Sequence, residues 1–216
     1  MFFYKVIHWI IYFLFKNQAA EVKGLENLPR NDGFIIAANH GTAYDPLIII
    51  TVLRNFLRRY FNPRMKKMYF LGSTRIKHRI LRYSIATVLV NVLDERIGYL
   101  PANCAGLTRA VELLGQGHIV VIFPEGRQNA EKQLLRGRRG VSIMALLSAK
   151  EIIPTGCFGI PAFSFREFHK LRSEEKRVVF DPGFFLTSLD KSVDATTNTI
   201  MWAISKVSNK DYPFSR

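Results

Sequence analysis

The stretch Ile35-Ile36-Ala37-Ala38-Asn39-His40-Gly41-Thr42-Ala43-Tyr44-Asp45-Pro46 contains an apolar run, a polar break and the start of a second apolar run. The first run is short and continuous, which is typical of a strand buried in a parallel sheet. Gly41 permits a tight turn, and Asp45 followed by Pro46 is a favourable helix N-cap and first helical position. The stretch therefore predicts a strand, a tight loop and the first turn of a helix.

Two polar side chains of this stretch, His40 and Asp45, are five positions apart. At about 100° per residue they do not share a helical face, so they can meet only if the chain turns between them. A carboxylate hydrogen-bonded to an imidazole orients the ring, which is the arrangement that a general base requires. The alternative is that Asp45 only caps the helix and that His40 is an ordinary loop residue. The stretch alone leaves both interpretations open.

Composition limits the kind of protein that this chain can be. A chain of 216 residues is long enough for one domain with a continuous core, and 48% hydrophobic and 12% aromatic residues exclude a disordered chain. The net charge of +14 indicates an anionic partner, such as nucleic acid, a membrane surface or a phosphorylated substrate. Cys104 and Cys157 match no metal or redox spacing, so we expect a reduced compartment and two small buried side chains.

The first sixteen residues are set apart by their apolar composition. Residues 2–15 would span only about 21 Å as a helix, less than the ~30 Å hydrocarbon core of a bilayer. The polar side chains line one helical face, and the aromatic and aliphatic ones lie largely away from it: Lys5, His8, Tyr12 and Lys16 against Phe2, Phe3, Val6, Trp9, Ile10 and Phe13. This pattern predicts an amphipathic membrane-interface helix over residues 1–16, followed by a single domain over residues 17–216. A tilted anchor and a helix packed on the core remain alternatives.

A basic segment follows between Pro46 and Leu93, where the chain has no acidic residue and ten basic ones. Aromatic residues are interleaved with the basic ones. Like charges repel without compensation, so a one-sided run of this length favours an anionic partner over a merely solvated surface. Lipid headgroups, a phosphorylated carrier or nucleic acid could each supply the compensating charge.

Apolar runs and helical patterns alternate along the chain. The predicted strands are Phe34–Ala38, Thr87–Val92, Ile119–Phe123, Ile152–Cys157 and Arg177–Phe180, and the predicted helices are Pro46–Tyr60, Pro101–Leu114, Val141–Lys150 and Asp190–Val207. This alternation predicts an α/β fold with a largely parallel central sheet flanked by helices. Ligands of such sheets bind at the carboxyl ends of strands. Asn39-His40 and Pro124-Glu125-Gly126-Arg127 both follow predicted strands, so we expect them to converge on one site.

These motifs carry a resemblance to a known family. Asn39-His40 with Asp45, and Phe123-Pro124-Glu125-Gly126 about eighty residues later, resemble the glycerolipid acyltransferases typified by 1-acylglycerol-3-phosphate acyltransferase. The resemblance extends to Gly24-Leu25-Glu26-Asn27-Leu28-Pro29 upstream and to Gly140 and Ile152-Ile153-Pro154 downstream, and it covers roughly residues 20–185. The histidine and aspartate spacing alone is a weak signal, but both motifs at this separation are a strong one.

The resemblance implies acyl transfer from a thioester, acyl-CoA or acyl carrier protein, to the free hydroxyl of 1-acylglycerol-3-phosphate, which gives phosphatidic acid in phospholipid biosynthesis. His40 would take the hydroxyl proton, and Asp45 would hold the imidazole tautomer. Backbone amides near Gly41 or Gly126 are candidate donors to the developing oxyanion. The implied partners are a membrane lipid surface, the lysophospholipid and the thioester donor, with the catalytic domain on the cytoplasmic side. No metal, bound cofactor, covalent enzyme intermediate or nucleic acid is implied.

The chain departs from the family where an acceptor phosphate would bind. The family's middle motif usually includes an arginine, but none directly follows Val90, and Gln128 stands where the third motif usually has one. We therefore expect Arg127 to bind the phosphate, helped by arginines of the following loop. The predicted substrate-binding residues are Asn39, Gly41, Glu125, Gly126, Arg127, Arg136, Arg138 and Arg139. Another lyso-lipid acceptor, or a non-catalytic basic module that binds membrane or RNA, remains an alternative.

Overall fold

The centre of the protein is one sheet, seen in the computed structural model, which describes residues 2–15, 21–42, 44–60, 67–72, 98–159, 176–186 and 192–214. Its strand order is β1-β7-β6-β2-β5-β3-β4. The pairs from β6 through β4 are parallel, whereas β7 is antiparallel to β6 and parallel to β1. The strands are β1 (Glu21–Lys23), β2 (Phe34–Ala38), β3 (Met68–Gly72), β4 (Tyr99–Pro101), β5 (Ile119–Ile122), β6 (Glu151–Phe158) and β7 (Arg177–Phe180).

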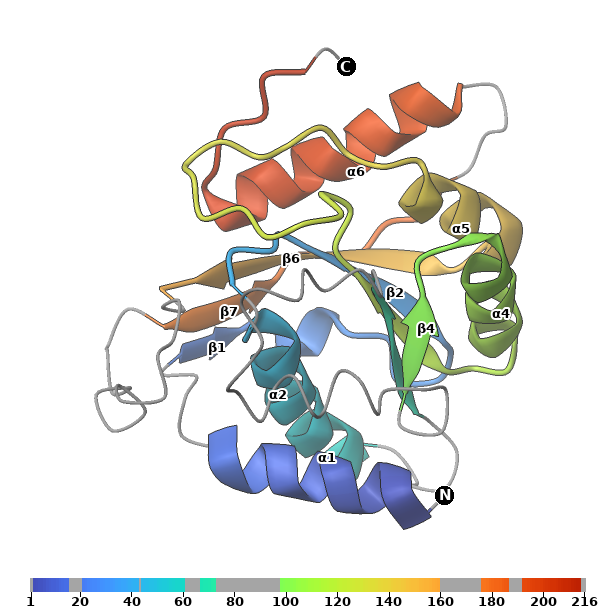
Figure 1. The fold of residues 1–216 in the computed structure, drawn as a ribbon, viewed down its shortest axis with the longest axis vertical. Helices are drawn as coiled ribbons and strands as arrows, with labels where there is room; N and C mark the ends of the chain where they lie inside the picture. Colours follow the sequence, from blue (N-terminus) through green and yellow to red (C-terminus); the bar gives the residue numbers. More distant parts are fainter. Residues whose placement is uncertain are drawn as a thin grey trace, which may run out of the picture.

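Helices cover both faces of this sheet (Figure 1). One face packs against three helices, α4 (Cys104–Gly115), α5 (Gly140–Ser148) and α6 (Val193–Ser208). The other face packs against α2 (Asp45–Tyr60), and α1 (Phe2–Phe15) lies outside α2. A short 3-10 helix, Leu25–Asn27, precedes β2. The predicted α/β class, with a mostly parallel sheet flanked by helices, is confirmed.

The predicted strand of the opening stretch is β2, and its bounds are those expected. Its five side chains are completely buried because both faces of the sheet are covered. Ile35 and Ala37 face the cluster formed with α4, α5 and α6, whereas Ile36 faces the cluster formed with α2. Since β2 pairs with both β5 and β6, it is a central strand of the sheet, and its carboxyl end lies between those two strands.

Several predicted boundaries were wrong by a few residues. Helix α2 begins at Asp45 instead of Pro46. Helix α4 begins at Cys104 because Pro101 belongs to β4, and the side chain of Asn103 caps the helix by accepting from the amide of Gly106 at 2.9 Å. Helix α5 ends at Ser148.

Helix α6 begins at Val193, not at Asp190, after a cap in which the hydroxyl of Ser192 accepts from the amide of Ala195 at 3.2 Å. Cys104 was expected to be buried and is exposed, whereas Cys157 is buried as predicted. Strand β3 was missed, because its residues lie within the basic segment. The predicted strand 87–92 and most of the basic segment lie outside the described residues.

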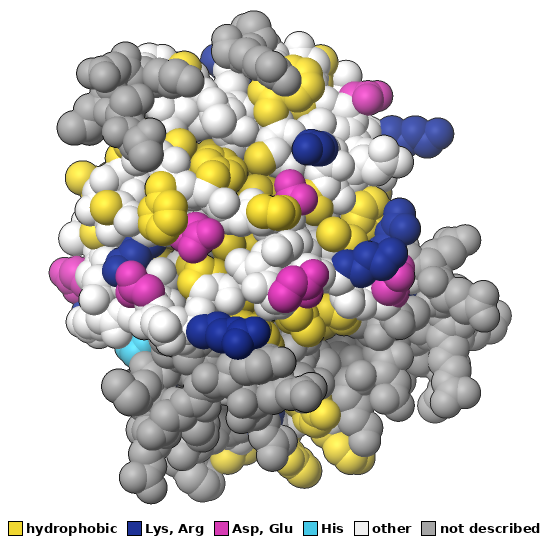
Figure 2. All heavy atoms as spheres, turned by 180° about the vertical axis from the view of Figure 1, so that it is seen from behind, with side chains coloured by type: hydrophobic (Ala, Val, Ile, Leu, Met, Phe, Trp, Pro, Cys, Tyr) yellow, Lys and Arg dark blue, Asp and Glu magenta, His cyan; other side chains and the backbone are white. Residues whose placement is uncertain are grey.

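The N-terminal helix α1 is present and packs on α2. Ile11 is buried beside Ile50 of α2, and the guanidinium of Arg54 lies over the Tyr12 ring at 5.3 Å. The opposite side is exposed and apolar: Val6, Trp9, Ile10 and Phe13. Hydrophobic side chains reach the surface at the lower end of Figure 2, the end where α1 lies in Figure 1. Among the residues described, no helix combines the length and hydropathy needed to cross a membrane.

Candidate active site

The predicted contact between His40 and Asp45 is present at the carboxyl end of β2. The two side chains are 3.0 Å apart, between the histidine Nδ1 and the aspartate Oδ2. Asp45 is only 1% exposed, whereas the His40 side chain keeps 15% of its surface accessible. The imidazole also stacks on the Phe123 ring, with centroids 4.3 Å apart at 26°. Because the Asp45 carboxylate accepts a hydrogen bond from the Nδ1–H group, Nε2 is left as the basic nitrogen that can contact a substrate.

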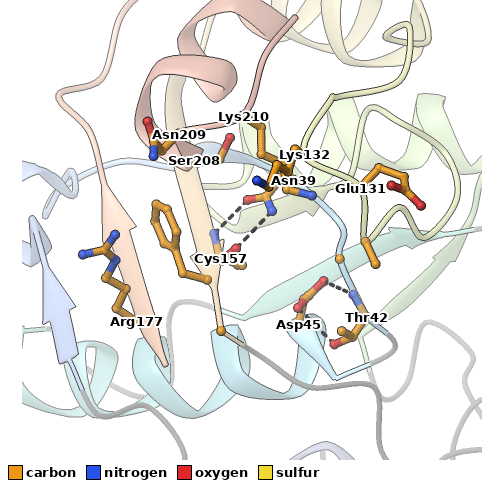
Figure 3. A pocket seen from close by; sticks show the side chains of 14 residues that line it. Asn39, Thr42, Asp45, Glu131, Lys132, Cys157, Arg177, Ser208, Asn209 and Lys210 are labelled. Carbon is orange, nitrogen blue, oxygen red and sulfur yellow. Dashed lines mark hydrogen bonds between the residues drawn. The ribbon is translucent and has the colours of Figure 1, made fainter. Parts of the chain in front are cut away.

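Thr42 holds the Asp45 carboxylate in place. Its amide donates to Oδ2 at 2.9 Å, and its hydroxyl donates to Oδ1 at 3.2 Å (Figure 3). The carboxylate therefore points back over the loop, one residue inside the helix that it was expected to cap. Thr42 was not singled out from the sequence, although a threonine three residues before an acidic residue at a helix start is a recognisable capping-box signal.

The two glycines proposed as oxyanion donors differ in the structure. Gly41 does not adopt a left-handed conformation, and a Cβ there would touch nothing, so the turn at this position does not depend on a glycine. The Gly41 amide makes no hydrogen bond within the described part of the chain, which leaves it available. The Gly126 amide donates to the carbonyl of Phe123 at 3.0 Å and is therefore occupied. Gly41 is the better candidate for an oxyanion donor.

Glu125 joins the two motifs, which converge as the sequence predicted. It is only 3% exposed, and its Oε1 accepts from the His40 amide at 3.1 Å. Its Oε2 accepts from the side chain of Asn129 at 2.7 Å and from the amide of Leu135 at 3.0 Å. Three protein donors surround this carboxylate, so Glu125 fastens the loop of His40 to the loop that follows β5.

Asn39 fixes the other side of the same loop. Its side chain donates to the carbonyl of Cys157 at 3.1 Å and accepts from the amide of Cys157 at 2.7 Å (Figure 3). This side chain extends the ladder of β2 and β6 beyond the last backbone pair, Ala38 with Thr155. Asn39 thus borders the site while its amide group anchors the end of β2 to β6.

The four predicted arginines do not form one cluster. The Arg138 side chain packs against Gly126, which has a φ of 70° and no room for a Cβ. Arg139 instead forms two hydrogen bonds with Asp194 of α6, at 2.7 and 2.6 Å, and these bonds lower the pKa of that carboxyl. Arg136 also lies close enough to Asp194 to lower its pKa by charge, and Arg127 is exposed.

A cavity of about 300 Å³ lies beside Asp45 (Figure 3). It is bounded by the loop after β2, the ends of β6 and β7, residues 130–132 and the end of α6. Three cationic side chains that were not predicted for the site line it: Lys132, Arg177 and Lys210. Cys157 forms part of its wall. Burial, and then the charge of Asp45, raise the pKa of the Cys157 thiol well above its usual range, so this thiol is neutral and unsuited to act as a nucleophile.

Fold and site together define an α/β protein with a histidine–aspartate pair at the carboxyl edge of a mostly parallel sheet. A model of the Acyltransferase family matches residues 19–158, a range that includes both motifs and most of the chain. The chain belongs to this acyltransferase family.

Proteins that are similar to it include two known acyltransferases. One is a 1-acyl-sn-glycerol-3-phosphate acyltransferase of Borreliella burgdorferi, 26% identical over 145 residues, which are 66% of this chain and 52% of the relative. The chain therefore matches about half the length of that relative. The other is the crystal structure of PlsC, the 1-acyl-sn-glycerophosphate (LPA) acyltransferase of Thermotoga maritima, with a TM-score of 0.62 and 15% identity. That match covers 95% of this chain and 80% of PlsC, and it supports the fold.

Proposed function

We propose that this protein transfers a fatty acyl group from a thioester, acyl-CoA or acyl carrier protein, to the free hydroxyl of 1-acylglycerol-3-phosphate. The product is phosphatidic acid, for phospholipid biosynthesis. The observation that carries the proposal is the hydrogen bond of His40 to the buried Asp45, at a strand end and within the segment that matches the family. The name of the bacterial relative supports this choice of acceptor.

The geometry supports direct transfer with His40 as the general base. Nε2 takes the proton of the acceptor hydroxyl as that oxygen attacks the carbonyl carbon of the thioester. The carbonyl oxygen becomes an oxyanion, for which the amide of Gly41 is a nearby donor. When the carbon–sulfur bond breaks, the departing thiolate receives the proton back from the imidazolium, which the Asp45 carboxylate stabilises. A positioned base of this kind contributes typically about 10²–10⁴-fold to the rate.

Arg138 is the best-placed of the predicted arginines for the acceptor phosphate. Its side chain lies on Gly126, next to the residue that bonds the His40 amide, whereas Arg139 is bound to Asp194. We expect Arg138→Ala to raise the KM for 1-acylglycerol-3-phosphate at least tenfold while leaving the KM for the donor unchanged. Lys206→Ala, an exposed charge change on α6, is the control. Equal KM values for both variants would exclude Arg138 from this role.

Replacing His40 tests the reaction itself. We expect His40→Ala to lose acyl transfer, measured as thiol release with a panel of lyso-lipid acceptors, while far-UV circular dichroism is unchanged. His118→Ala is a matched control, because His118 immediately precedes β5 and so lies near the opposite, amino edge of the sheet. Transfer that survives in His40→Ala would overturn the mechanism.

The same assay separates the competing functions. A wild-type protein that prefers a lysophospholipid with a headgroup has a different acceptor from the one proposed. A protein that transfers no acyl group to any acceptor, but binds RNA with a steep salt dependence that His40→Ala leaves unchanged, is a basic binding module.

We also propose that the exposed side of α1 attaches the protein to a lipid surface on the cytoplasmic side. Val6, Trp9, Ile10 and Phe13 follow the spacing of one helical stripe, and Trp9 stacks on Phe13 with centroids 5.8 Å apart. Phe13 is 58% exposed, whereas His8 and Ile11 on another side of the helix are buried. An apolar stripe turned outward from the protein suits a helix that lies in a membrane interface.

Liposome sedimentation tests this attachment. We expect the double substitution of Trp9 and Phe13 by serine to reduce binding to vesicles that contain anionic lipid at least tenfold, because about 1.5–3 kcal/mol is lost for each large apolar side chain. Leu147→Ser, at an exposed leucine of α5 on the opposite side of the sheet, is the matched control. Equal sedimentation of both variants would rule out α1 as the attachment site.

A further inference from the structure

Asn129 is a buried loop residue that no motif argument had singled out. It is 6% exposed, and all its polar groups take part in hydrogen bonds. Its backbone amide donates to the carbonyl of His40 at 2.6 Å, and its carbonyl accepts from the Lys210 ammonium at 2.9 Å. Its side-chain nitrogen donates at 2.7 Å both to Oε2 of Glu125 and to the carbonyl of Gln133. Its side-chain oxygen accepts from the amide of Glu131 at 3.2 Å.

These bonds hold the catalytic histidine by its backbone from both sides. The His40 amide donates to Glu125, and the His40 carbonyl accepts from Asn129. The Asn129 side chain links the two restraints, since it bonds the other oxygen of the same Glu125 carboxylate. A shift of the loop of His40 away from Asp45 must therefore break bonds to Asn129, to Glu125, or to both.

We propose that Asn129 is a positioning residue for the acyl-transfer reaction. By orienting the Glu125 carboxylate, its side-chain amide fixes the backbone of His40 and keeps the imidazole on Asp45. The inference rests on the proposed function for its kinetic readout, whereas the geometry that it predicts can also be measured without turnover. A small displacement of a general base is costly, because proton transfer requires near hydrogen-bond distance to the reacting hydroxyl.

Asn129→Asp tests this role through its dependence on pH. The substitution replaces a donor by a second carboxylate about 2.7 Å from Glu125. Charged groups of the described residues near this point include the Lys210 ammonium, which donates to the Asn129 carbonyl, and, through His40, the Asp45 carboxylate. Two adjacent carboxylates cannot both be ionised without strong repulsion, but a shared proton restores a hydrogen bond between them. The defect should therefore be greatest at high pH and should decrease as the pH falls.

We expect kcat of Asn129→Asp to be reduced about 100-fold at pH 8, which corresponds to about 2.7 kcal/mol of activation free energy. KM should change less than threefold. The ratio of variant to wild-type kcat should rise at least tenfold on lowering the pH to 6. Combining it with Glu125→Gln should recover part of the lost activity at pH 8, because the introduced amide can donate to the introduced carboxylate, while the Leu135 amide and the Gln133 carbonyl lose the partners that they have in the wild type. Gln133→Glu is the control: it adds the same charge to the same loop at an exposed side chain.

Two results would overturn the proposal. One is a kcat ratio for Asn129→Asp that does not change with pH, and the other is activity within threefold of wild type at pH 8. If Asn129→Asp does not fold, as judged by thermal unfolding, Asn129→Ser replaces it, and kcat reduced at unchanged KM is the required result. A large loss of activity in Gln133→Glu would also count against the proposal, because any charge in the loop would then suffice.

A proton-detected NMR spectrum of the N–H groups of the His40 ring separates this proposal from the proposed function. We expect Asn129→Asp at pH 8 to lose the hydrogen-bonded Nδ1 proton signal that wild type and Gln133→Glu retain. A wild-type protein that shows this signal but transfers no acyl group refutes the proposed function alone. A signal that survives in Asn129→Asp refutes the positioning role, whatever the activity.

Discussion

Asp45→Asn separates two contributions of the aspartate, the orientation of the imidazole and the negative charge. Oδ2 accepts both from Nδ1 of His40 and from the amide of Thr42, whereas Oδ1 accepts, among the residues that the structure describes, from the Thr42 hydroxyl. An asparagine whose oxygen occupies the Oδ2 position keeps the first two bonds. Its NH₂ group then faces a hydroxyl, which can accept instead of donate. The substitution should therefore preserve the tautomer and remove mainly the charge.

The size of the effect follows from the 3.0 Å separation of Nδ1 and Oδ2. When the imidazolium forms, its attraction to the carboxylate is about 5.5 kcal/mol at an effective dielectric constant near 20. Loss of that attraction lowers kcat by about 10⁴-fold, at 1.36 kcal/mol per factor of ten. KM should change little, because the charge acts on a state that forms only during reaction. Asp45→Ala should have a still lower kcat, because it also removes the bond that orients the ring, and a lower stability, because it leaves the buried groups of Thr42 without an acceptor.

Thiol-release kinetics and urea unfolding of the two variants check these expectations. Asp32→Asn is the matched control, because Asp32 lies before the amino end of β2 and pairs with Lys150 at the surface. We expect Asp45→Asn to unfold within about 1 kcal/mol of wild type, and Asp45→Ala to be less stable by about 2–3 kcal/mol or more. Asp45→Asn that keeps more than a tenth of wild-type kcat would refute the charge argument. Equal stability of the two variants would refute the hydrogen-bond argument.

Three further substitutions test the fold around the site. Ile36→Ala should lower the free energy of unfolding by about 2–5 kcal/mol, because it empties a completely buried position in the central strand; a urea midpoint equal to wild type would contradict this. Gly126→Ala should lower the free energy of unfolding by about 1–3 kcal/mol, because alanine is strained at a φ of 70°. The added Cβ also clashes with the Arg138 side chain, and Arg138→Ala should relieve that part of the loss. A melting temperature that Gly126→Ala leaves unchanged, with Arg138 present or replaced by alanine, would contradict this expectation. The bond to Arg139 lowers the pKa of Asp194, so Asp194→Asn should lower the free energy of unfolding at neutral pH. This difference in stability from wild type should vanish as the pH falls below the ordinary aspartate value of 3.8, because the wild-type carboxyl is then protonated. A difference that persists in acid would contradict the role of the ion pair.

The parts of the fold that the sequence predicts well are those with local signals. β2 has the expected bounds because a continuous apolar run ends abruptly at Asn39, and β7 has the expected bounds for the same kind of reason. The apolar residues of β3 carry the same signal, but their neighbours are basic, and the charge of the surrounding segment concealed it. The predicted start of α4 was wrong for a different reason. Whether Pro101 ends a strand or begins a helix depends on its pairing with Gly72, a contact that is not local.

The candidate site divides in the same way. The bond of His40 to Asp45 could be predicted, since its two partners are five residues apart and a turn is enough to join them. The bond of Glu125 to the His40 amide could not, because its partners are 85 residues apart and it requires a particular strand order and register. The convergence of the two motifs could be predicted, because ligands of such sheets bind at the carboxyl ends of strands. The ion pair of Arg139 with Asp194 could not be predicted from the sequence, because it depends on where α6 packs.

The register of β2 and β5 explains why the two motifs meet level with each other. Ala37 pairs with Ile122 in the parallel ladder, and His40 and Glu125 each lie three residues beyond their paired residue. Parallel strands advance equally per residue, so both chains leave the sheet at the same height, and the Glu125 side chain needs to cross only the spacing of adjacent strands, about 4.8 Å. A slip of one residue would turn the β2 side chains to the opposite faces and move the His40 amide by about 3.3 Å relative to Glu125. The complete burial of β2 on both faces opposes such a slip, so the apolar strand that precedes the histidine also helps to place it against its partner.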